Sequence, residues 1–306
     1  MAVRTTTESP PRRLRLPHDA LLGYALLIPT GVVLVLLVGY PTVLAVMMSF
    51  QKKLLGSQVA PFIGFGNYEA LLGMPLFWTS VRNVFVFTTA SVTLKVVLGT
   101  AVAVILNETL PLRGIIRSIV LLPWALPTLV TVLIWSWMYN DIAGIFNYVL
   151  MQTGVVDRPQ IFLGDVSLAM PSVILVNVWR GFPFFAITLL AGLQVVGEDL
   201  YDAAKVDGAG VVSRFRAVTL PGLAPVLAVV TLLSTIWTFN DFVIIWMLTH
   251  GGPANATDVL STITYRIAIQ GLELGKGVAV SVIMLPILVA LVLLLTKFVT
   301  QREEGL

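Results

Sequence analysis

The sequence predicts an all-α protein that crosses a membrane with six helices. Its composition and the distribution of its apolar residues lead to this fold class. Only 11% of the 306 residues are charged and 57% are hydrophobic, whereas about a quarter of the residues in a soluble domain are charged. The hydrophobic residues form six segments, and each has the roughly 20 apolar residues that a helix needs to cross about 30 Å of hydrocarbon. We therefore expect a polytopic membrane protein.

The six expected spans account for most of the chain. They cover residues 20–50, 83–107, 118–140, 168–193, 222–248 and 278–298. The first apolar run is too long for a signal peptide, so we interpret it as a span, and Pro29 and Pro41 are expected to end or kink it. Residues 20–299 then form the membrane domain. Residues 1–19 are an N-terminal tail and residues 300–306 a C-terminal tail.

The basic residues predict the orientation of these spans. One side of the membrane receives eleven of them, which are Arg4, Arg12, Arg13, Arg15, Arg113, Arg117, Lys205, Arg214, Arg216, Lys297 and Arg302. The other side receives six, which are Lys52, Lys53, Arg82, Arg158, Arg266 and Lys276. The side with the excess of basic residues is expected to be cytoplasmic. Both termini are then cytoplasmic, and the longer loops at residues 51–78, 141–167 and 249–277 face outward.

Several kinds of chemistry are excluded by the residue types that the chain lacks or separates. The sequence has no cysteine, which excludes disulfides, thiolate nucleophiles and cysteine metal sites. His18 and His250 lie in separate flanking segments without a partner at ligand spacing, so no metal site is expected. The net charge of +3 does not indicate binding to nucleic acid, because the basic residues lie beside apolar spans rather than in one patch.

One charged, helix-forming segment lies between the fourth and fifth spans, at residues 198–221. Its apolar and charged residues recur at helical spacing, which predicts an amphipathic helix outside the bilayer. Gly208 is expected to end this helix in the left-handed conformation, and Pro221 to force a second break before the fifth span. Taken alone, the segment is a surface helix–turn–helix that joins two spans.

The same segment resembles the EAA loop of ATP-binding-cassette importer permeases. The matching residues are Asp202, Ala203, Ala204, Asp207, Gly208, Ala209, Phe215, Val218, Leu220 and Pro221. In that family the loop docks into a cleft of the ATPase subunit, so the resemblance implies that these residues couple the chain to an ATPase. Asp202 stands where the family usually has glutamate. Because its side chain is one methylene shorter, the reach of this contact is left open.

A second resemblance, densest over residues 172–285, is to the carbohydrate permeases of this family. The matching strings are Phe239-Asn240-Asp241-Phe242 and Leu248-Thr249-His250-Gly251-Gly252-Pro253, although the acid here precedes the second phenylalanine of the pattern instead of following it. Taken alone, the Gly-Gly-Pro string indicates only a turn that ends a helix. Within the family the chain is similar to trehalose-importer permeases, which makes a disaccharide, trehalose first, the expected substrate.

The resemblance also implies partners and a mechanism. A permease of this type is a multi-pass protein of the bacterial inner membrane with the fold of a type I importer transmembrane domain. It pairs with a second homologous permease, receives sugar from an extracytoplasmic sugar-binding lipoprotein, and works by alternating access. An ATPase dimer on the cytoplasmic side holds the ATP and Mg²⁺. The chain itself is then expected to bind no cofactor and to be no enzyme.

Other functions fit the sequence less well. The nearest string to a phosphate-binding loop, at residues 271–277, has three residues where four are needed and Gly277 where serine or threonine should bind magnesium. An ion-coupled secondary transporter remains the main alternative, but such proteins usually have internal repeats and an intramembrane carboxylate. Asp241 offers such a carboxylate, and no repeat is found. A membrane enzyme would need a catalytic constellation, and the expected spans have neither cysteine nor histidine.

Polar and aromatic residues inside the expected spans are the candidates for a substrate path, because a charge at mid-bilayer costs at least about 2.5 kcal/mol. The candidates are Asn83, Lys95, Asn177, Trp179, Arg180, Trp237, Phe239, Asn240 and Asp241. In this interpretation the polar groups exchange hydrogen bonds with sugar hydroxyls, and the aromatic residues, with Phe184, offer stacking faces. The alternative is that the polar residues hold neighbouring helices together or snorkel. Further aromatic residues near span ends fit interfacial belts, namely Trp78, Trp124, Trp135, Trp137 and Tyr139.

Overall fold

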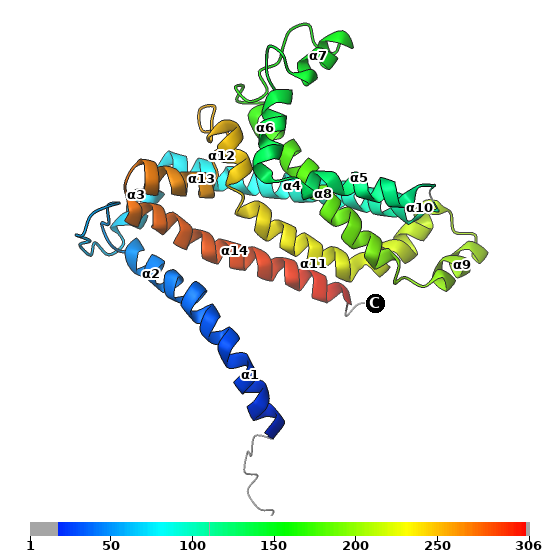
Figure 1. Ribbon diagram of the computed structural model, residues 1–306, viewed down its shortest axis with the longest axis horizontal. Helices are drawn as coiled ribbons and strands as arrows, with labels where there is room; N and C mark the ends of the chain where they lie inside the picture. Colours follow the sequence, from blue (N-terminus) through cyan, green and yellow to red (C-terminus); the bar gives the residue numbers. More distant parts are fainter. Residues whose placement is uncertain (1–17, 110, 304–306) are drawn as a thin grey trace, which may run out of the picture. The chain divides into compact units, whose positions relative to one another are not determined.

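The computed structural model describes residues 18–109 and 111–303, with side chains for residues 23–109 and 111–297 (Figure 1). Helices make up most of this part of the chain. No β-strand occurs among the described residues, and the one isolated β-bridge there joins Gln51 and Phe62. The chain forms two compact units, residues 1–47 and 48–306. The predicted all-α class is therefore confirmed.

The described residues of the first unit form one long helix, which continues to Ser49. Helix α1 (His18–Leu34) passes through a π-helical turn (Val35–Gly39) into α2 (Tyr40–Ser49), so neither Pro29 nor Pro41 ends it. Apolar side chains are exposed along its length, and Leu26 and Leu37 are typical. Residues 23–49 are long and apolar enough to cross a membrane, which agrees with the predicted first span. A helix that is apolar on all sides needs lipid or another apolar partner around it.

Three long helices build the core of the second unit. Helix α4 (Pro75–Asn107) packs along α8 (Ala169–Leu193), and α11 (Leu220–Phe239) contacts both of them (Figure 1). Their buried side chains form one apolar cluster, which includes Leu106, Phe185, Leu189 and Leu223. Helix α14 (Leu274–Glu303) packs on α11. The predicted second, fourth and sixth spans are confirmed as helices, and the second begins eight residues earlier than expected.

The third span is broken rather than straight. Helix α5 (Arg113–Ala125) is followed by α6 (Thr128–Met138) at an angle of 92°. The break lies at Leu126, whose backbone is extended at φ −69° and ψ 139°. A residue before proline is pushed out of the helical conformation, and Pro127 has no N–H to continue the helix. The predicted third span over residues 118–140 is thus formed by two helices that meet at a bend, and the described residues hold five further helices that are long and apolar enough to cross a membrane.

The fifth span is also divided. Helix α11 ends at Phe239, and α12 (Val243–Thr249) begins after a short interruption. The interruption contains Asn240 and Asp241, and the Oδ1 atom of Asp241 accepts a hydrogen bond of 3.2 Å from the backbone N–H of Ile244. A carboxylate that caps the next helix in this way competes with continuation of the preceding one. The predicted fifth span over residues 222–248 is therefore divided between two helices, and the helix that is long and apolar enough to cross a membrane covers residues 211–239.

Pro221 does not break the chain as the sequence predicted. Residues 211–239 are helical throughout and include α10 (Val211–Arg214), a π-helical turn (Phe215–Thr219) and α11. Pro221 lies in the first turn of α11, directly after the π-helical turn. In that turn the hydrogen bonds are shifted, so the missing N–H and the ring of proline are accommodated and the helical assignment continues through Pro221.

Short helices form the segments between the long ones. On the sides predicted to face outward lie α3 (Gly66–Leu72), α7 (Ile145–Gln152) and α13 (Leu260–Tyr265), and α13 continues into a π-helical turn (Arg266–Gln270). Between α8 and α10 lies α9 (Glu198–Val206). A second apolar cluster joins α4, α8, α12 and α13, and Phe87, Val176, Ile244 and Ile263 belong to it. These contacts fix the ends of the two broken spans.

Candidate functional site

A polar cavity of about 290 Å³ lies where both broken spans meet α4 and α8. Trp124 and Thr128 line it from the two sides of the break in the third span, and Asn240 and Asp241 from the break in the fifth. The remaining lining residues are Lys95, Asn177, Arg180, Gly181, Phe184, Ser234, Trp237, Thr238, Phe242 and Val243. Irregular backbone inside a membrane protein is tolerated where it lines a wet cavity. The two helix breaks therefore mark this cavity as the candidate functional site.

Six of the nine residues predicted for the substrate path line this cavity. They are Lys95, Asn177, Arg180, Trp237, Asn240 and Asp241. Phe184, expected to offer a stacking face, lines it as well and lies 5.2 Å from Trp237 between ring centroids. The cavity thus combines amide and charged groups with aromatic faces. That mixture is typical of sites for small polar molecules.

The other three predicted path residues make contacts elsewhere. Asn83 donates hydrogen bonds to the backbone carbonyls of Asn255, Ala256 and Asp258, at 3.2, 3.1 and 2.9 Å. Trp179 packs against another tryptophan in an aromatic cluster with a centroid distance of 5.5 Å. Phe239 is fully buried in the core.

Hydrogen bonds position two of the three charged residues in the cavity. The Nζ atom of Lys95 donates to the Oγ1 atom of Thr238 at 3.0 Å. The amide of Asn177 donates to the Oδ2 atom of Asp241 at 2.9 Å. The described residues form ion pairs within 4.0 Å at three places, all of them outside the cavity. The Nε atom of Arg180 is buried and has no hydrogen-bond partner among the described residues.

Close packing between α4 and α8 brings Lys95 to the cavity. A Cβ atom added at Gly181 would lie 2.5 Å from the Cε atom and 3.0 Å from the Nζ atom of Lys95. The lysine side chain therefore lies directly across the glycine, and a larger residue there would have to displace it. Gly181 could not be identified from the sequence, because a glycine inside an apolar helix gives no signal until its neighbour is known.

Two polar cavity residues on α11, Ser234 and Thr238, were not identified from the sequence. They are four residues apart, and the predicted Asp241 follows three residues later, which is the spacing of one helix face. That periodicity was the available signal. Trp124 was assigned to an interfacial belt because it lies near the end of an apolar run. The break at Pro127 instead turns the chain so that Trp124 lines the cavity.

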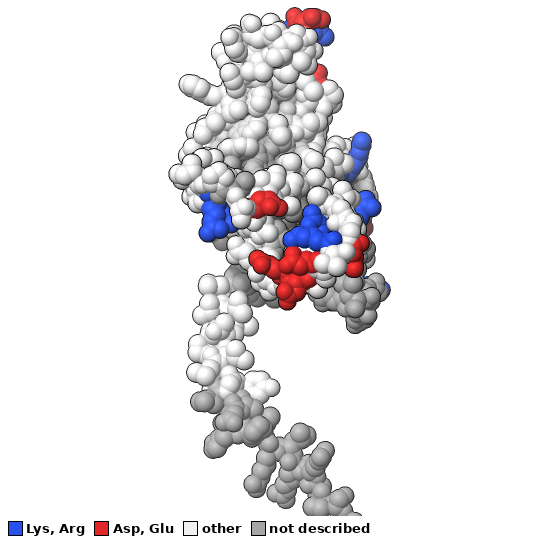
Figure 2. Space-filling view, turned by 90° about the vertical axis from the view of Figure 1, so that its right-hand side faces the viewer, with Lys and Arg blue, Asp and Glu red and all other residues white. Residues whose placement is uncertain are grey.

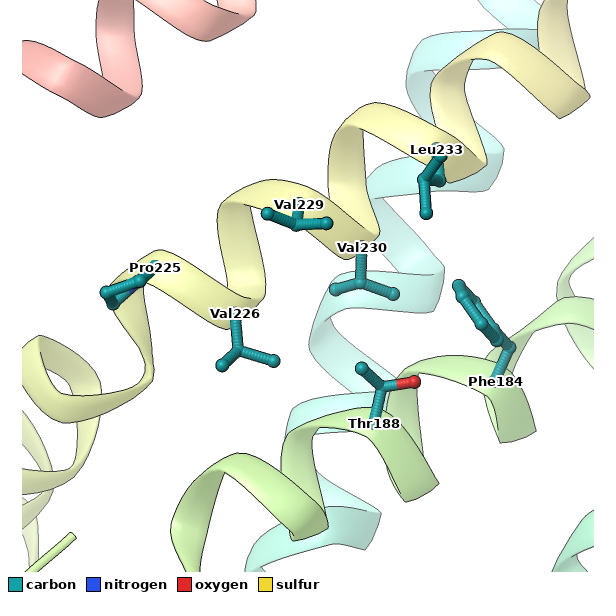
Figure 3. Close-up of a pocket in the computed structure, with 7 residues that line it drawn as sticks. All are labelled: Phe184, Thr188, Pro225, Val226, Val229, Val230 and Leu233. Atoms are coloured by element: carbon teal, nitrogen blue, oxygen red, sulfur yellow. The ribbon is translucent and has the colours of Figure 1, made fainter. Parts of the chain in front are cut away.

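A second cavity, in contrast to the first, is almost entirely apolar. It measures about 310 Å³ and lies between α8 and α11 (Figure 3). Its lining is apolar except for Thr188, and the sticks in Figure 3 are mainly valine, leucine, proline and phenylalanine side chains. It offers almost no hydrogen-bonding group to a sugar. Apolar surface of this kind suits lipid or another helix.

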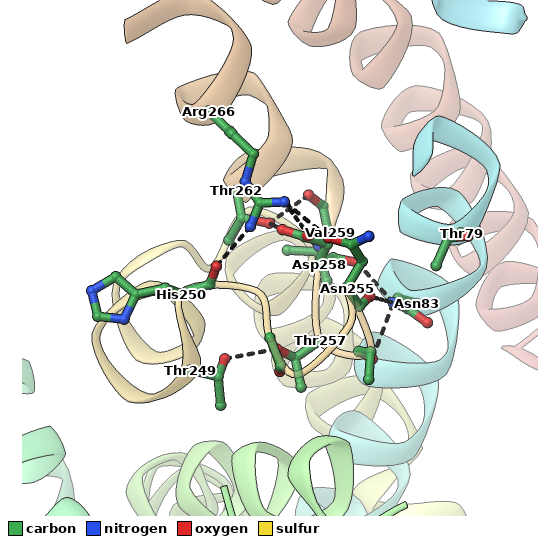
Figure 4. Close-up of polar contacts among 12 residues, drawn as sticks. Thr79, Asn83, Thr249, His250, Asn255, Thr257, Asp258, Val259, Thr262 and Arg266 are labelled. Atoms are coloured by element: carbon green, nitrogen blue, oxygen red, sulfur yellow. Dashed lines mark hydrogen bonds and ion pairs between the residues drawn. The ribbon is translucent and has the colours of Figure 1, made fainter. Parts of the chain in front are cut away.

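A network of polar contacts on the loop after α12 joins three elements, and we call it the outer clip (Asn83, Asp258, Thr262 and Arg266) (Figure 4). The fully buried carboxylate of Asp258 pairs with the Nη1 atom of Arg266 at 2.8 Å and accepts a hydrogen bond of 3.0 Å from Thr262. Arg266 also donates to the carbonyl of His250 at 2.8 Å. Burial raises the pKa of Asp258, and the attraction of Arg266 opposes this shift. The outer clip fixes the loop against α4.

The predicted coupling segment is an exposed helical hairpin. Gly208 has φ +73°, so the left-handed turn expected from the sequence is confirmed. Asp202 pairs with Lys205 at 2.7 Å on the surface of α9. Apolar side chains are exposed beside these charges, and Val206 and Val211 are the clearest cases at 87% and 74% exposure.

Figure 2 shows acidic and basic side chains gathered on the face that carries α9 and α10. The acidic residues of α9 include Glu198 and Asp199 in its first turn, and the basic residues nearby include Arg214 and Arg216. A surface with mixed charges and exposed apolar residues is suited to binding another protein. The other predicted coupling residues, Ala203, Ala204, Asp207, Ala209, Phe215, Leu220 and Pro221, lie on the same hairpin or at the start of α11.

Comparisons with known proteins agree with this architecture. The family described as "Binding-protein-dependent transport system inner membrane component" matches residues 95–303. The trehalose/maltose transport system permease protein MalF of Thermococcus litoralis is 38% identical over 87% of this chain and 89% of its own length. The sulfoquinovosyl glycerol transport system permease protein SmoG of Agrobacterium fabrum is 35% identical over 87% of this chain and 86% of its own.

A solved structure shares the fold. A bacterial ABC transporter involved in the import of the acidic polysaccharide alginate superposes with a TM-score of 0.80, at 24% identity, over 92% of this chain and 96% of that one. The family match covers the cavity, the coupling hairpin and the outer clip except Asn83. The chain therefore belongs to the family of binding-protein-dependent transport system inner membrane components, and it is a multi-pass permease of an ABC sugar importer.

Proposed function

We propose that the polar cavity is the sugar path of this permease and that it opens alternately to the two sides of the membrane. The observation that carries this proposal is that the bend between α5 and α6 and the interruption between α11 and α12 line one polar cavity. Broken helices are used by transporters to present backbone and side-chain groups to a substrate. A family of ATP-driven permeases leaves no need for the ion-coupled secondary mechanism considered from the sequence.

The lining residues supply the chemistry that a sugar requires. Asn177 and Asn240 carry amides, and Ser234 and Thr238 carry hydroxyls, so each can replace a water molecule at a sugar hydroxyl. Trp124 and Trp237 line the same space. A cavity of about 290 Å³ is small for a ligand site, since such sites measure about 300–1,000 Å³. We expect a second permease to complete its walls.

The substrate that we propose is a glycoside of disaccharide size. The relative from Thermococcus litoralis is named for trehalose and maltose, which supports trehalose as the neutral candidate. The relative from Agrobacterium fabrum is named for sulfoquinovosyl glycerol, a glycoside with a sulfonate. The family itself thus accommodates both neutral and anionic sugars, and the charge of the substrate must be decided by the residues of the cavity.

The coupling hairpin would transmit the ATPase cycle to this cavity. We propose that its mixed charges and exposed apolar residues bind one subunit of an ATPase dimer, which holds ATP and Mg²⁺. The hairpin continues into α11 without a break, and α11 carries Ser234, Trp237 and Thr238. A push on the hairpin would therefore move one wall of the cavity as a rigid lever. An external sugar-binding lipoprotein would deliver the substrate from the other side.

Uptake into membrane vesicles that contain the complete transporter tests this proposal. Labelled trehalose, maltose and trehalose 6-phosphate are supplied with the external binding protein and internal ATP. For whichever sugar is imported, Asn177→Ala and Trp237→Ala should each lower uptake by about tenfold or more, because each removes a hydrogen bond or a stacking face of about 1–3 kcal/mol. Val229→Ala, in the apolar cavity of Figure 3, is the matched control and should transport normally. Normal uptake by both cavity variants would overturn the proposal.

A further inference from the structure

The charges of the polar cavity do not balance. Lys95 and Arg180 contribute two positive charges and Asp241 one negative charge, and the cavity has no other charged lining residue. If a proton moves from Lys95 to Asp241, the net charge of the cavity stays the same, because a neutral pair and an ion pair both have a net charge of zero. One positive charge therefore remains in excess in either state. It belongs to a guanidinium, which does not lose its proton in proteins.

The existing contacts leave the guanidinium of Arg180 available. Asp241 is already held by the amide of Asn177 at 2.9 Å and the backbone N–H of Ile244 at 3.2 Å. Lys95 donates to Thr238. Arg180 is half-buried, forms no ion pair within 4.0 Å among the described residues, and has a buried Nε atom without a partner there. A half-buried cation without a partner is costly, and a ligand that pairs with it recovers that cost.

The packing of α8 brings the second cation to the same place. Arg180 and Gly181 are consecutive, and the Lys95 side chain lies across Gly181. The ammonium of Lys95 therefore lies next to the helix turn that carries Arg180, and both line one cavity. A planar guanidinium fork beside an ammonium matches the oxygens of a carboxylate, sulfonate or phosphate group.

We propose that this permease transports a disaccharide-sized sugar that carries an anionic oxygen group, and that Arg180, assisted by Lys95, is the residue that selects for the charge. The inference rests on the proposed function of the cavity and narrows its substrate class. The anionic group lies against Arg180, while Trp237 and the amides contact the sugar rings. A neutral disaccharide satisfies those ring contacts but leaves the excess cation unpaired.

Direct binding to the assembled transporter tests this inference without the selectivity of the external binding protein. The transporter is placed in nanodiscs and titrated with trehalose and with trehalose 6-phosphate, which differ by one phosphate group. Tryptophan fluorescence reports binding, because Trp124 and Trp237 line the cavity. A hydrogen bond to a charged group exceeds one to a neutral group by about 1–1.5 kcal/mol, so the phosphorylated sugar should bind about tenfold more tightly.

Two matched variants identify the residue responsible. Arg180→Gln should abolish the preference for trehalose 6-phosphate, so that the two sugars bind with equal affinity. Arg82→Gln removes an exposed positive charge of α4 that does not line the cavity, and it should keep the preference. Equal binding of the two sugars by the wild type, or a preference that survives in Arg180→Gln, would overturn the inference while the proposed function stands. Binding of neither sugar would overturn the assignment of the cavity itself.

Discussion

At the scale of single residues, the polar cavity depends on Gly181, which has no side chain. Gly181 has no Cβ, and this space is occupied by the Lys95 side chain. The same contact brings α4 and α8 close together, so the position of the ammonium and the packing of two spans have one cause. A change at Gly181 should therefore affect substrate recognition and helix packing together.

We predict that Gly181→Ala displaces the Lys95 side chain from the cavity. The added Cβ atom would lie 2.5 Å from Cε, and overpacking of this kind costs about 1–3 kcal/mol. Uptake should fall strongly and the thermal unfolding temperature should fall slightly. Gly114→Ala is the control, because nothing lies within 4 Å of a Cβ atom at that position. Equal uptake by the two variants would show that the placement of Lys95 is irrelevant to transport.

Asp258 in the outer clip gives a pH-dependent prediction. Burial raises the pKa of this carboxyl in the folded protein despite the attraction of Arg266. The folded state therefore takes up the proton at a higher pH than the unfolded chain does. The stabilisation from this group is complete below the unfolded pKa of about 3.9 and is lost as the pH rises through the raised folded pKa.

Hydrogen exchange of the loop at residues 249–266, corrected for the intrinsic effect of pH, measures this dependence. Protection should increase as the pH falls from neutral toward 4. In Asp258→Asn the same loop should show a flat profile over that range, because the titrating group is gone. A profile unchanged by the substitution would assign the pH dependence to another group.

At the scale of elements, breaks in helices do as much for function as the helices themselves. The interruption at Asn240 and Asp241 and the one at Leu126 and Pro127 open a polar space within two apolar spans. By contrast, the continuous helix over residues 211–239 joins the coupling hairpin to the cavity. The fifth span is therefore continuous between the coupling hairpin and the cavity, and it is interrupted at the cavity itself, where substrate must be contacted.

The turn between α9 and α10 should be essential for this transmission. Gly208 has φ +73°, and a β-branched residue in that conformation costs about 1–2 kcal/mol and redirects the following helix. We expect Gly208→Val to insert into the membrane at normal levels and to lose uptake and sugar-stimulated ATP hydrolysis. Gly210→Val is the matched control, since Gly210 has φ −68° and nothing within 4 Å of its Cβ position. Wild-type uptake by Gly208→Val would make the hairpin an ordinary connector.

At the scale of the whole molecule, the length of the apolar segments predicted every long helix. The two breaks were not predictable, because each lies inside an apolar run and depends on what the interrupted backbone contacts. Pro123 lies inside α5 without ending it, whereas the helix does end just before Leu126 and Pro127. The presence of a proline alone therefore does not predict where a helix breaks. Pro221 was expected to break the chain and does not.

The sequence predicted the chemical character of the site more successfully than it predicted which individual residues form the site. The cost of placing polar groups in lipid identified Lys95, Arg180 and Asp241, which all line the cavity. It could not separate these from Asn83, whose amide fixes a distant loop. The partner of a polar side chain is set by tertiary packing, and a single sequence does not contain that information. The cytoplasmic position of residues 198–221 stays a prediction from the basic residues.

Chemical labelling checks that orientation. The chain has no cysteine, so Lys205→Cys introduces a single thiol on an exposed position of α9. An impermeant thiol reagent should not label intact cells and should label them after permeabilisation. Labelling from outside would reverse the topology and place the coupling hairpin away from ATP.

Asn240→Cys provides the most direct test of alternating access through the polar cavity. Asn240 is exposed at the break in the fifth span and lines the cavity. In vesicles of the complete transporter, we expect an impermeant thiol reagent to reach this cysteine from the cytoplasmic side without nucleotide, and from the outer side when ATP and vanadate trap the ATPase. Val229→Cys, in the apolar cavity, should remain unlabelled in both states. Labelling of Asn240→Cys from the same side in both states, or from both sides at once, would contradict the account.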